Sequence, residues 1–309
     1  MMDEPIIFDS DPGIGGILAT STALTDPRID LKLLTTVTAD GQIAKATQHS
    51  LNLVAFYQRN VPVAGGAAHA LIKPYEPQSD VYNNDGTADY EYPDYETAPL
   101  PEAAADAMYA ALCRSPKPMT LVVTGPYTNL ALLLLNHPDC KNKIKRLILL
   151  GGALSRGNVN SLADYNVFTD PEAAVAVYQS GLPITMVSLD VNLNALITDD
   201  TINQLKQIGP LAESFQALYK KYLRDIPGGV PAYDMHAFAY LLHPEFYTTK
   251  KYWIDVQTDG PASGVTVADI RGAYHNGQTN ATVCTGVDAK AFNAWFLREV
   301  SVIQDIFIH

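Results

Sequence analysis

The alternation of short apolar runs with helical stretches constrains the fold of this chain more than any other feature. Each run is rich in aliphatic and β-branched residues, and the stretch after it has the spacing of a helix that buries one face. In chain order the pairs are PIIFD and ILATSTALT, LKLLTTVTA and IAKATQHSLNLVAFYQRN, MTLVVTG and NLALLLLNHP, and RLILLGGA and PEAAVAVYQSG, with PITMVSLDV as a further strand. Near-continuous apolar strands between helices are typical of a parallel sheet that is covered on both faces. The sequence therefore predicts an α/β fold with an open, mainly parallel central sheet flanked by helices.

Polar and small residues collect where the predicted strands end. In open parallel sheets, ligands bind outside the carboxyl ends of the strands. The residues at those ends are Asp9 and Asp11, Asp40, Thr124 and Gly125, Gly151 and Gly152, and Asp190. A single Gly or Asp after a strand is common turn chemistry. Their accumulation at successive strand ends is what indicates a binding site.

Two regions stand outside the alternation. Residues 74–99 are rich in Pro, Asp, Asn and Tyr, and this segment is too polar for core and too long for an ordinary connection, so we expect a mobile active-site loop. Residues 198–247 are predicted to be mainly helical, and the tail YWIDVQTDG, GVTVADI and ATVCTGV predicts antiparallel strands before a final helix AFNAWFLREV. No repeat or domain boundary is evident, so residues 1–309 are expected to form a single domain.

Composition excludes several classes of protein. A 47% hydrophobic content in 309 residues can supply a sizeable core, and a net charge of −12 argues against nucleic acid as a partner, because that needs clustered Lys and Arg. No apolar run approaches the ~20 residues of a membrane span, and the acidic start MMDEPIIFDSDPG runs directly into a strand. We expect a soluble cytoplasmic protein whose three widely spaced cysteines, Cys113, Cys140 and Cys284, are reduced and buried.

The segment IIFDSDPGIGG carries the first candidate chemistry. Alternate residues of a strand point the same way, so Asp9 and Asp11 form a natural site for a hard cation. A strand that ends in Asp-x-Asp is also found in haloacid dehalogenase-type phosphotransferases. The chain lacks the later Gly-Asp-x-x-x-Asp motif that those enzymes need, which argues against that alternative.

The ordered set of motifs resembles the nucleoside hydrolase family, the inosine- and uridine-preferring, calcium-dependent N-ribohydrolases. That family has Asp-x-Asp-Pro-Gly-x-Asp-Asp near the N-terminus, where this chain has DSDPGIGG at 9–16. Further matches are VPVAGG at 61–66, TGPYTNLALLL at 124–134, LLGGA at 149–153, GN at 157–158, ADYN at 163–166, DPEAA at 170–174 and a Pro-x-x-Asp at 231–234. The resemblance spans almost the whole chain. It implies a Rossmann-like core, a small nucleoside ligand and a homodimer or homotetramer.

The resemblance also implies a site and a reaction. A calcium ion would be held by carboxylates and by the 2′- and 3′-hydroxyls of ribose, while an activated water attacks the anomeric carbon. Carried over by position, Asp11 is a ligand and the general base, and the Thr124 carbonyl and Asp234 are further ligands. The implied substrate contacts are Asp9, Asn158, Asp164 and Asn166. Calcium prefers such oxygen donors, and negative charge stabilises an oxocarbenium-like transition state.

The chain departs from the family pattern at the metal. The usual Asp-Asp pair is Gly15-Gly16, so one acceptor for a ribose hydroxyl and one carboxylate ligand are missing. The usual Asn after the second strand is Asp40, which either replaces the lost ligand or contacts the substrate. Because calcium affinity depends on the number of carboxylates, we predict weak calcium binding.

Further departures affect the sugar and the leaving base. The usual ribose-contacting Glu is shortened to Asp164, and the usual His before the late metal ligand is Tyr233, whose phenol with a pKa of about 10 donates its proton less readily than an imidazolium. Asn83 or Asn84 stands where a loop His is common, and His236 and His243 are expected to be structural. We therefore predict a nucleoside hydrolase with impaired or altered activity. The alternative is a catalytically silent homologue that binds a nucleoside or another small polar ligand.

Overall fold

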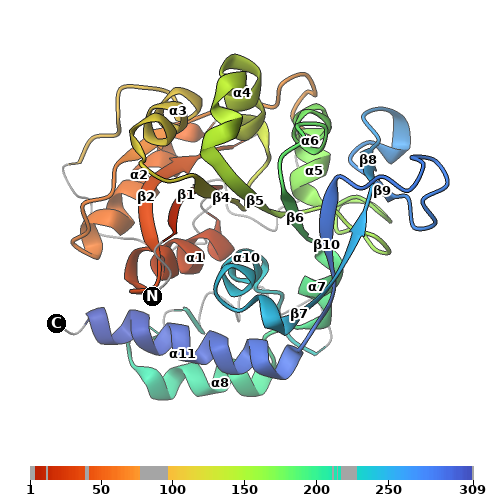
Figure 1. Cartoon of the computed structure of the whole chain (residues 1–309). Helices are drawn as coiled ribbons and strands as arrows, with labels where there is room; N and C mark the ends of the chain where they lie inside the picture. The colour runs from red at the N-terminus through yellow and green to blue at the C-terminus, as the bar shows by residue number, and fades with distance from the viewer. Residues whose placement is uncertain are drawn as a thin grey trace.

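The computed structural model describes residues 4–11, 13–38, 42–76, 97–210, 212–213, 215–216 and 228–307. It consists of a central sheet with helices on both faces (Figure 1). The sheet has eight strands in the order β3-β2-β1-β4-β5-β6-β10-β7. The strands are β1 (Pro5–Ser10), β2 (Asp30–Thr36), β3 (Val63–Gly65), β4 (Met119–Val123), β5 (Ile144–Leu150), β6 (Ile184–Val187), β7 (Tyr247–Tyr252) and β10 (Ala281–Val287).

Strand pairing confirms the mainly parallel sheet. β1 pairs in parallel with β2 and β4, β5 with β4 and β6, and β3 with β2. The tail is more complex than the predicted antiparallel strands, because β10 pairs antiparallel with β7 and in parallel with β6. β8 (Ile254–Val256) and β9 (Thr266–Ala268) form a separate two-stranded antiparallel sheet.

Apolar side chains on alternate residues of the strands fill two cores, one on each face of the sheet. Phe8 of β1 packs into one core, in edge-to-face contact with Phe238, and Ile7 packs into the other. The helices are α1 (Ile14–Thr25), α2 (Ile43–Phe56), α3 (Ala104–Arg114), α4 (Thr128–Asn136), α5 (Tyr165–Thr169), α6 (Pro171–Tyr178), α7 (Leu189–Asn194), α8 (Asp199–Ile208), α10 (Tyr233–Leu242) and α11 (Ala289–Phe307), with short 3₁₀ turns η1 (Pro138–Lys143), η2 (Pro244–Phe246) and η3 (Gly260–Ala262). In Figure 1, α3, α4 and α6 lie on one side of the sheet, and α1, α10 and α11 on the other.

Some local expectations need correction. Asp190 lies in the first turn of α7 rather than at a strand end, because β6 stops at Val187. All three cysteines are free, but only Cys140 and Cys284 are buried, since Cys113 at the end of α3 is exposed. Most of the expected loop at 74–99 lies outside the described residues, and the single-domain organisation stays a prediction. Within the described part of the chain, no helix combines the length and apolar character needed to cross a membrane.

Candidate functional site

The site lies where β1, β4 and β5 end and where α1 and α10 begin. Asp9 is the fifth residue of β1 and is 1% exposed. Its Oδ1 accepts hydrogen bonds from Thr35 Oγ1 at 2.6 Å and from Asn129 Nδ2 at 2.8 Å, while Oδ2 has no partner among the described residues. Burial raises the pKa of Asp9 to about 6. The Asp9 carboxylate is therefore fixed through Oδ1, and its Oδ2 can accept a hydrogen bond from a ligand.

Asp11 follows β1 and lies against the turn after β4. A Cβ added to Gly125 would be 2.9 Å from the Asp11 amide nitrogen and 2.6 Å from Val37 Cγ1, so only glycine allows this approach. Burial raises the pKa of Asp11 well above its ordinary value, and the negative charge of Asp234 raises it further, with smaller contributions from Asp9 and Asp164. The structure thus brings four predicted carboxylates together.

Gly15 and Gly16 let the first turn of α1 lie against these acids. A Cβ on Gly15 would be 2.6 Å from Asp234 Oδ2, and one on Gly16 would be 2.9 Å from the Asp11 carbonyl oxygen and 3.1 Å from Ser10 Oγ. Asp234, in the first turn of α10, is 6% exposed, and burial raises its pKa to about 7. Where the family pattern has two acidic side chains, this chain has bare backbone in contact with Asp234 and Asp11.

The opposite side of the site is the segment 151–166, which is held by hydrogen bonds to the backbone. Asp164 caps α5 and its Oδ1 accepts from the amides of Asn166 and Val167, yet burial raises its pKa to about 6. Gly151 has φ +140°, and a Cβ there would be 2.7 Å from Tyr127 Oη and 2.9 Å from Asp164 Oδ1. The turn after β5 therefore requires glycine.

Three of the groups predicted to contact the metal or the sugar already make hydrogen bonds within the protein. Asn166 Nδ2 donates to the carbonyl oxygens of Thr124 at 2.7 Å and of Leu150 at 3.0 Å, so one lone pair of Thr124 is used and the Asn166 Oδ1 is left for a ligand. Asn158 Oδ1 accepts from the Tyr165 amide at 2.9 Å. These residues shape the site as well as facing it.

Tyr233 bridges the two sides of the site. Its hydroxyl is hydrogen-bonded to the Asn158 side chain, and burial, with the nearby charge of Asp164, raises its pKa above the ordinary value. The phenol therefore keeps its proton at neutral pH. Asp40, Asn83 and Asn84 lie outside the described residues.

The acids of the site fit a cation, with few ligands to hold it. Among the residues that the structure describes, no basic side chain forms an ion pair with Asp9, Asp11, Asp164 or Asp234. The described residues also contain no group of three or more His, Cys, Asp or Glu side chains placed to hold a metal. Buried carboxylates without countercharge favour a cation or protons. Asp11, Asp234 and the Thr124 carbonyl are the donors that this chain offers.

Sequence reasoning missed the residues that support these acids. Asn129 donates to Asp9, to the Thr36 carbonyl oxygen and, through its Oδ1, accepts from the Ala67 amide. It lies inside the matched motif at 124–134, which was the available signal, but a side chain on a helix gives no indication of a partner on a distant strand. Tyr127, from the same motif, is fully buried below Gly151 and donates to the Leu150 carbonyl at 3.1 Å.

Comparison with known proteins gives matches over almost the whole chain. A family model described as inosine-uridine preferring nucleoside hydrolase matches residues 6–294. The chain is 38% identical over 293 residues to the non-specific ribonucleoside hydrolase RihC of Salmonella enteritidis PT4, which covers 94% of this chain and 95% of that relative. Among solved structures, a purine-preferring ribonucleoside hydrolase from Gardnerella vaginalis superposes with a TM-score of 0.89 at 28% identity, covering 98% of this chain and 100% of that one. A plant nucleoside hydrolase superposes with a TM-score of 0.88 at 26% identity, covering 96% and 99%. Every residue of the candidate site lies inside the matched range.

Proposed function

The chain belongs to the inosine-uridine preferring nucleoside hydrolase family, and from this premise we propose that it cleaves the N-glycosidic bond of a purine or pyrimidine ribonucleoside to release base and ribose. The observation that supports this most is the gathering of the buried Asp9, Asp164 and Asp234 around the partly buried Asp11, all without a described basic partner. Positive charge develops on the sugar as the bond to the base breaks, and fixed negative charge in a dry site stabilises it.

Each step of the proposed reaction falls to a residue of this site. Asp11 accepts a proton from water while the water oxygen bonds to the anomeric carbon, and the electron pair of the glycosidic bond leaves with the base. The base then takes up a proton. Tyr233 stands where a proton donor is needed, but its raised pKa makes it a poor acid, so the proposed activity is lower for bases that must be protonated as they leave.

The proposed metal is calcium, held weakly by Asp11, Asp234 and the carbonyl of Thr124. When bound, calcium orients the sugar hydroxyls and makes water easier to deprotonate. Gly16 supplies no carboxylate, and Asp40 is the candidate for a further ligand or for a substrate contact. Fewer carboxylates mean lower affinity for the ion.

The proposed contacts to the sugar come from Asp9, Asn158, Asp164 and Asn166, with Asp40 and Asn83 as further candidates. Assembly as a homodimer or homotetramer and a cytoplasmic location are also part of the proposal. Nucleic acid is not among the proposed partners, because the chain carries a net charge of −12. A membrane is not among them either, because no apolar run approaches the ~20 residues of a span.

One set of observations favours the second candidate function, a silent nucleoside-binding homologue. Gly15 and Gly16 bring backbone against Asp234 and Asp11, and the Thr124 carbonyl is already engaged by Asn166. A screen of purine and pyrimidine ribonucleosides and deoxyribonucleosides with excess calcium, read as released base, separates the two functions. We expect turnover of at least one ribonucleoside, and turnover slower by about 10²–10⁴ in Asp11→Asn. Binding of inosine or uridine by calorimetry with no turnover of any substrate would establish the silent homologue instead.

A further inference from the structure

Two helices of the site begin side by side without an interlocking side chain between them. Gly15 lies in the first turn of α1 and Asp234 in the first turn of α10, and a Cβ on Gly15 would be 2.6 Å from Asp234 Oδ2. Because Gly15 presents only backbone, the first turn of α1 offers α10 no interlocking side chain. Near this end, α10 makes a directional contact through His236 Nδ1, which lies 2.9 Å from Tyr247 Oη of β7. The register of Asp234 therefore depends on contacts elsewhere along the two helices.

Two further contacts of α10 are weakly directional. Phe238 meets Phe8 of β1 edge to face with ring centroids 4.9 Å apart, and Met235 Sδ, in the first turn of α10, lies 3.6 Å from Thr22 Oγ1 of α1. Dispersion contacts and a hydroxyl–sulfur contact change little when a helix shifts by a fraction of an ångström. They hold α10 against β1 and α1 without fixing its axial position.

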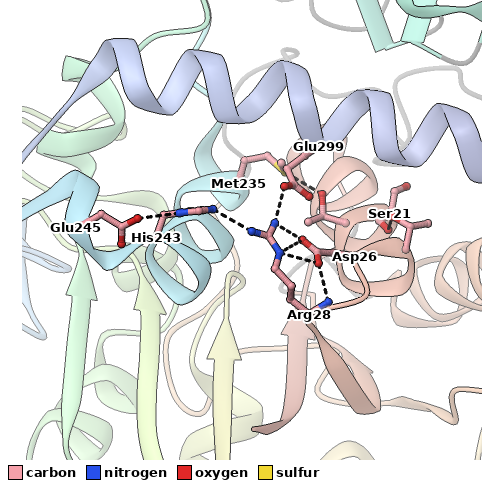
Figure 2. A network of polar contacts seen from close by, with 9 residues as sticks. Ser21, Asp26, Arg28, Met235, His243, Glu245 and Glu299 are labelled. Atoms are coloured by element: carbon pink, nitrogen blue, oxygen red, sulfur yellow. Dashed lines mark hydrogen bonds and ion pairs between the residues drawn. The ribbon is translucent and has the colours of Figure 1, made fainter. Parts of the chain in front are cut away.

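The far ends of the two helices meet in a directional network around Arg28 (Figure 2). Arg28 Nε donates to Asp26 Oδ1 at 2.9 Å, where Asp26 follows the last residue of α1. Arg28 Nη2 donates to Glu299 Oε1 of α11 at 2.7 Å, and Nη1 lies 3.0 Å from Nε2 of His243, the residue that ends α10. One rigid guanidinium thus joins the ends of α1 and α10 to the middle of α11.

The donors and acceptors around His243 determine which of its ring nitrogens carries the hydrogen. An arginine can only donate, so His243 Nε2 accepts, and Nδ1 carries the hydrogen that is donated to Glu245 Oε1 at 2.9 Å. The imidazole ring also stacks on Phe246, with centroids 4.8 Å apart. The Asp26 and Glu299 side chains are only 2% and 5% exposed, so they enclose the guanidinium of Arg28. Burial raises the pKa of Glu299 to about 7, so the lasting negative charge beside Arg28 is that of Asp26.

We propose that Arg28, acting through His243, is a positioning residue that holds the far end of α10 and, together with the His236–Tyr247 contact, sets the register of α10 and thereby the place of Asp234 in the site. The importance of that place for activity rests on the proposed function. The 10 residues of α10 span about 15 Å, so the network acts on Asp234 from the opposite end of a rigid helix.

The chain contains a matched control for this proposal. His137 ends α4 with φ −129° and ψ 63°, as His243 ends α10 with φ −140° and ψ 60°, and each is followed by a Pro that opens a 3₁₀ turn. His137 also stacks on an aromatic ring, that of Tyr109, at 4.0 Å. Its partner is Asp106, whose side chain is 59% exposed, rather than an arginine that joins helices. His137→Leu therefore shows the effect of losing a histidine at the end of a helix without the loss of a contact to Arg28.

The test compares His243→Leu, His243→Gln and His137→Leu with the wild type. Glutamine can still accept from Arg28, whereas leucine cannot. We expect His243→Leu to lower kcat on nitrophenyl riboside about tenfold to a hundredfold, as displacements near 1 Å do, and to speed amide hydrogen exchange at residues 233–236. His243→Gln should keep both close to wild type, and His137→Leu should change neither.

The exchange measurement decides the proposal whether or not the protein is active. Exchange at 233–236 that is the same in His243→Leu as in the wild type would overturn it, as would His243→Gln behaving like His243→Leu. A wild type that fails to hydrolyse nitrophenyl riboside would count against the proposed function alone. Arg28→Lys is a second variant, because lysine keeps the positive charge beside Asp26 and Glu299 but lacks the several N–H donors of the guanidinium. It should match His243→Leu in the amide exchange at residues 233–236.

Discussion

The two sides of the candidate site differ in how they hold their functional groups. On the β1–α1 side, residues 9–16, the backbone itself approaches Asp11 and Asp234 because Gly15 and Gly16 carry no side chain. On the 151–166 side, Asp164 and Asn166 are each tied by two hydrogen bonds to the main chain. If the proposed function holds, the second side is the rigid frame for the sugar, whereas the first lacks two carboxylates of the family pattern that substitution can restore.

Removing the acid that remains on the β1–α1 side should have the largest effect. Asp11→Asn deletes the proposed base, and we expect kcat to fall by about 10²–10⁴, because general base catalysis typically contributes that factor. Thermal stability should not fall, since a buried carboxylate with a raised pKa is replaced by a neutral group. Ser10→Ala, at the buried neighbour, is the control. A kcat for Asp11→Asn within threefold of wild type would remove Asp11 from the mechanism.

The rigidity of the 151–166 side can be broken at its glycine turn. Gly151→Ala places a Cβ at φ +140° and 2.7 Å from Tyr127 Oη, so we expect a loss of about 3–4 kcal/mol in urea unfolding from strain and overlap together. Gly181→Ala is the matched control, because Gly181 has φ +77° with nothing within 4 Å. Equal losses in the two variants would mean that backbone strain alone explains the effect and that the packing on Asp164 is loose.

The buried acid of the same side predicts a pH dependence of stability. The pKa of Asp164 in the folded protein is about 6, above the ordinary 3.8, so the folded state holds this proton more tightly and stability falls as pH rises from about 4 to 6. The expected loss from this group is roughly 2–3 kcal/mol. Asp164→Asn, which keeps an oxygen to cap α5, should lose less stability over that range. Parallel pH curves for the two proteins, measured without calcium, would contradict this.

Gly16→Asp tests whether the β1–α1 side can regain a metal ligand. We expect calcium to bind about tenfold more tightly, equal to about 1.4 kcal/mol, because the ion gains a carboxylate. The new Cβ lies 2.9 Å from the Asp11 carbonyl oxygen, so a small shift of the backbone accompanies the change. Gly16→Asn repeats the shape without the charge. Calorimetry that gives the same affinity for wild type and Gly16→Asp would mean that Asp40 or another group already completes the shell.

Tyr233→His should have the smallest effect and a selective one. An imidazolium protonates a leaving base more readily than the phenol, whose pKa burial raises, so we expect a gain in kcat on inosine of about tenfold at most. No gain is expected on nitrophenyl riboside, because its leaving group needs no proton. Equal gains on both substrates would show that position 233 acts on the sugar, through Asn158, rather than on the base.

Strand periodicity was enough to predict the sheet and the strand-end residues Asp9, Asp11 and Thr124. Local pattern predicted a mainly helical segment at 198–247, and the resemblance to the family motif at 231–234 singled out Asp234 at the start of α10. The position of β10 between β6 and β7 could not be predicted from the sequence, because pairing between distant segments depends on packing that no local pattern records. For the same reason the sequence could not show that Asn129 supports Asp9, or that the bare backbone of Gly15 meets the carboxylate of Asp234.

The close approach of Gly15 to Asp234 makes the side chain that position 15 can carry and the rotamer at position 234 depend on each other. A side chain at position 15 must displace the carboxylate that a Cβ would approach to 2.6 Å, so its consequence depends on which residue and which rotamer occupy position 234. Because the family pattern carries an acid at both positions, an Asp at position 15 requires another rotamer of Asp234 rather than another residue there. A design that changes position 15 therefore has to repack the Asp234 side chain at the same time.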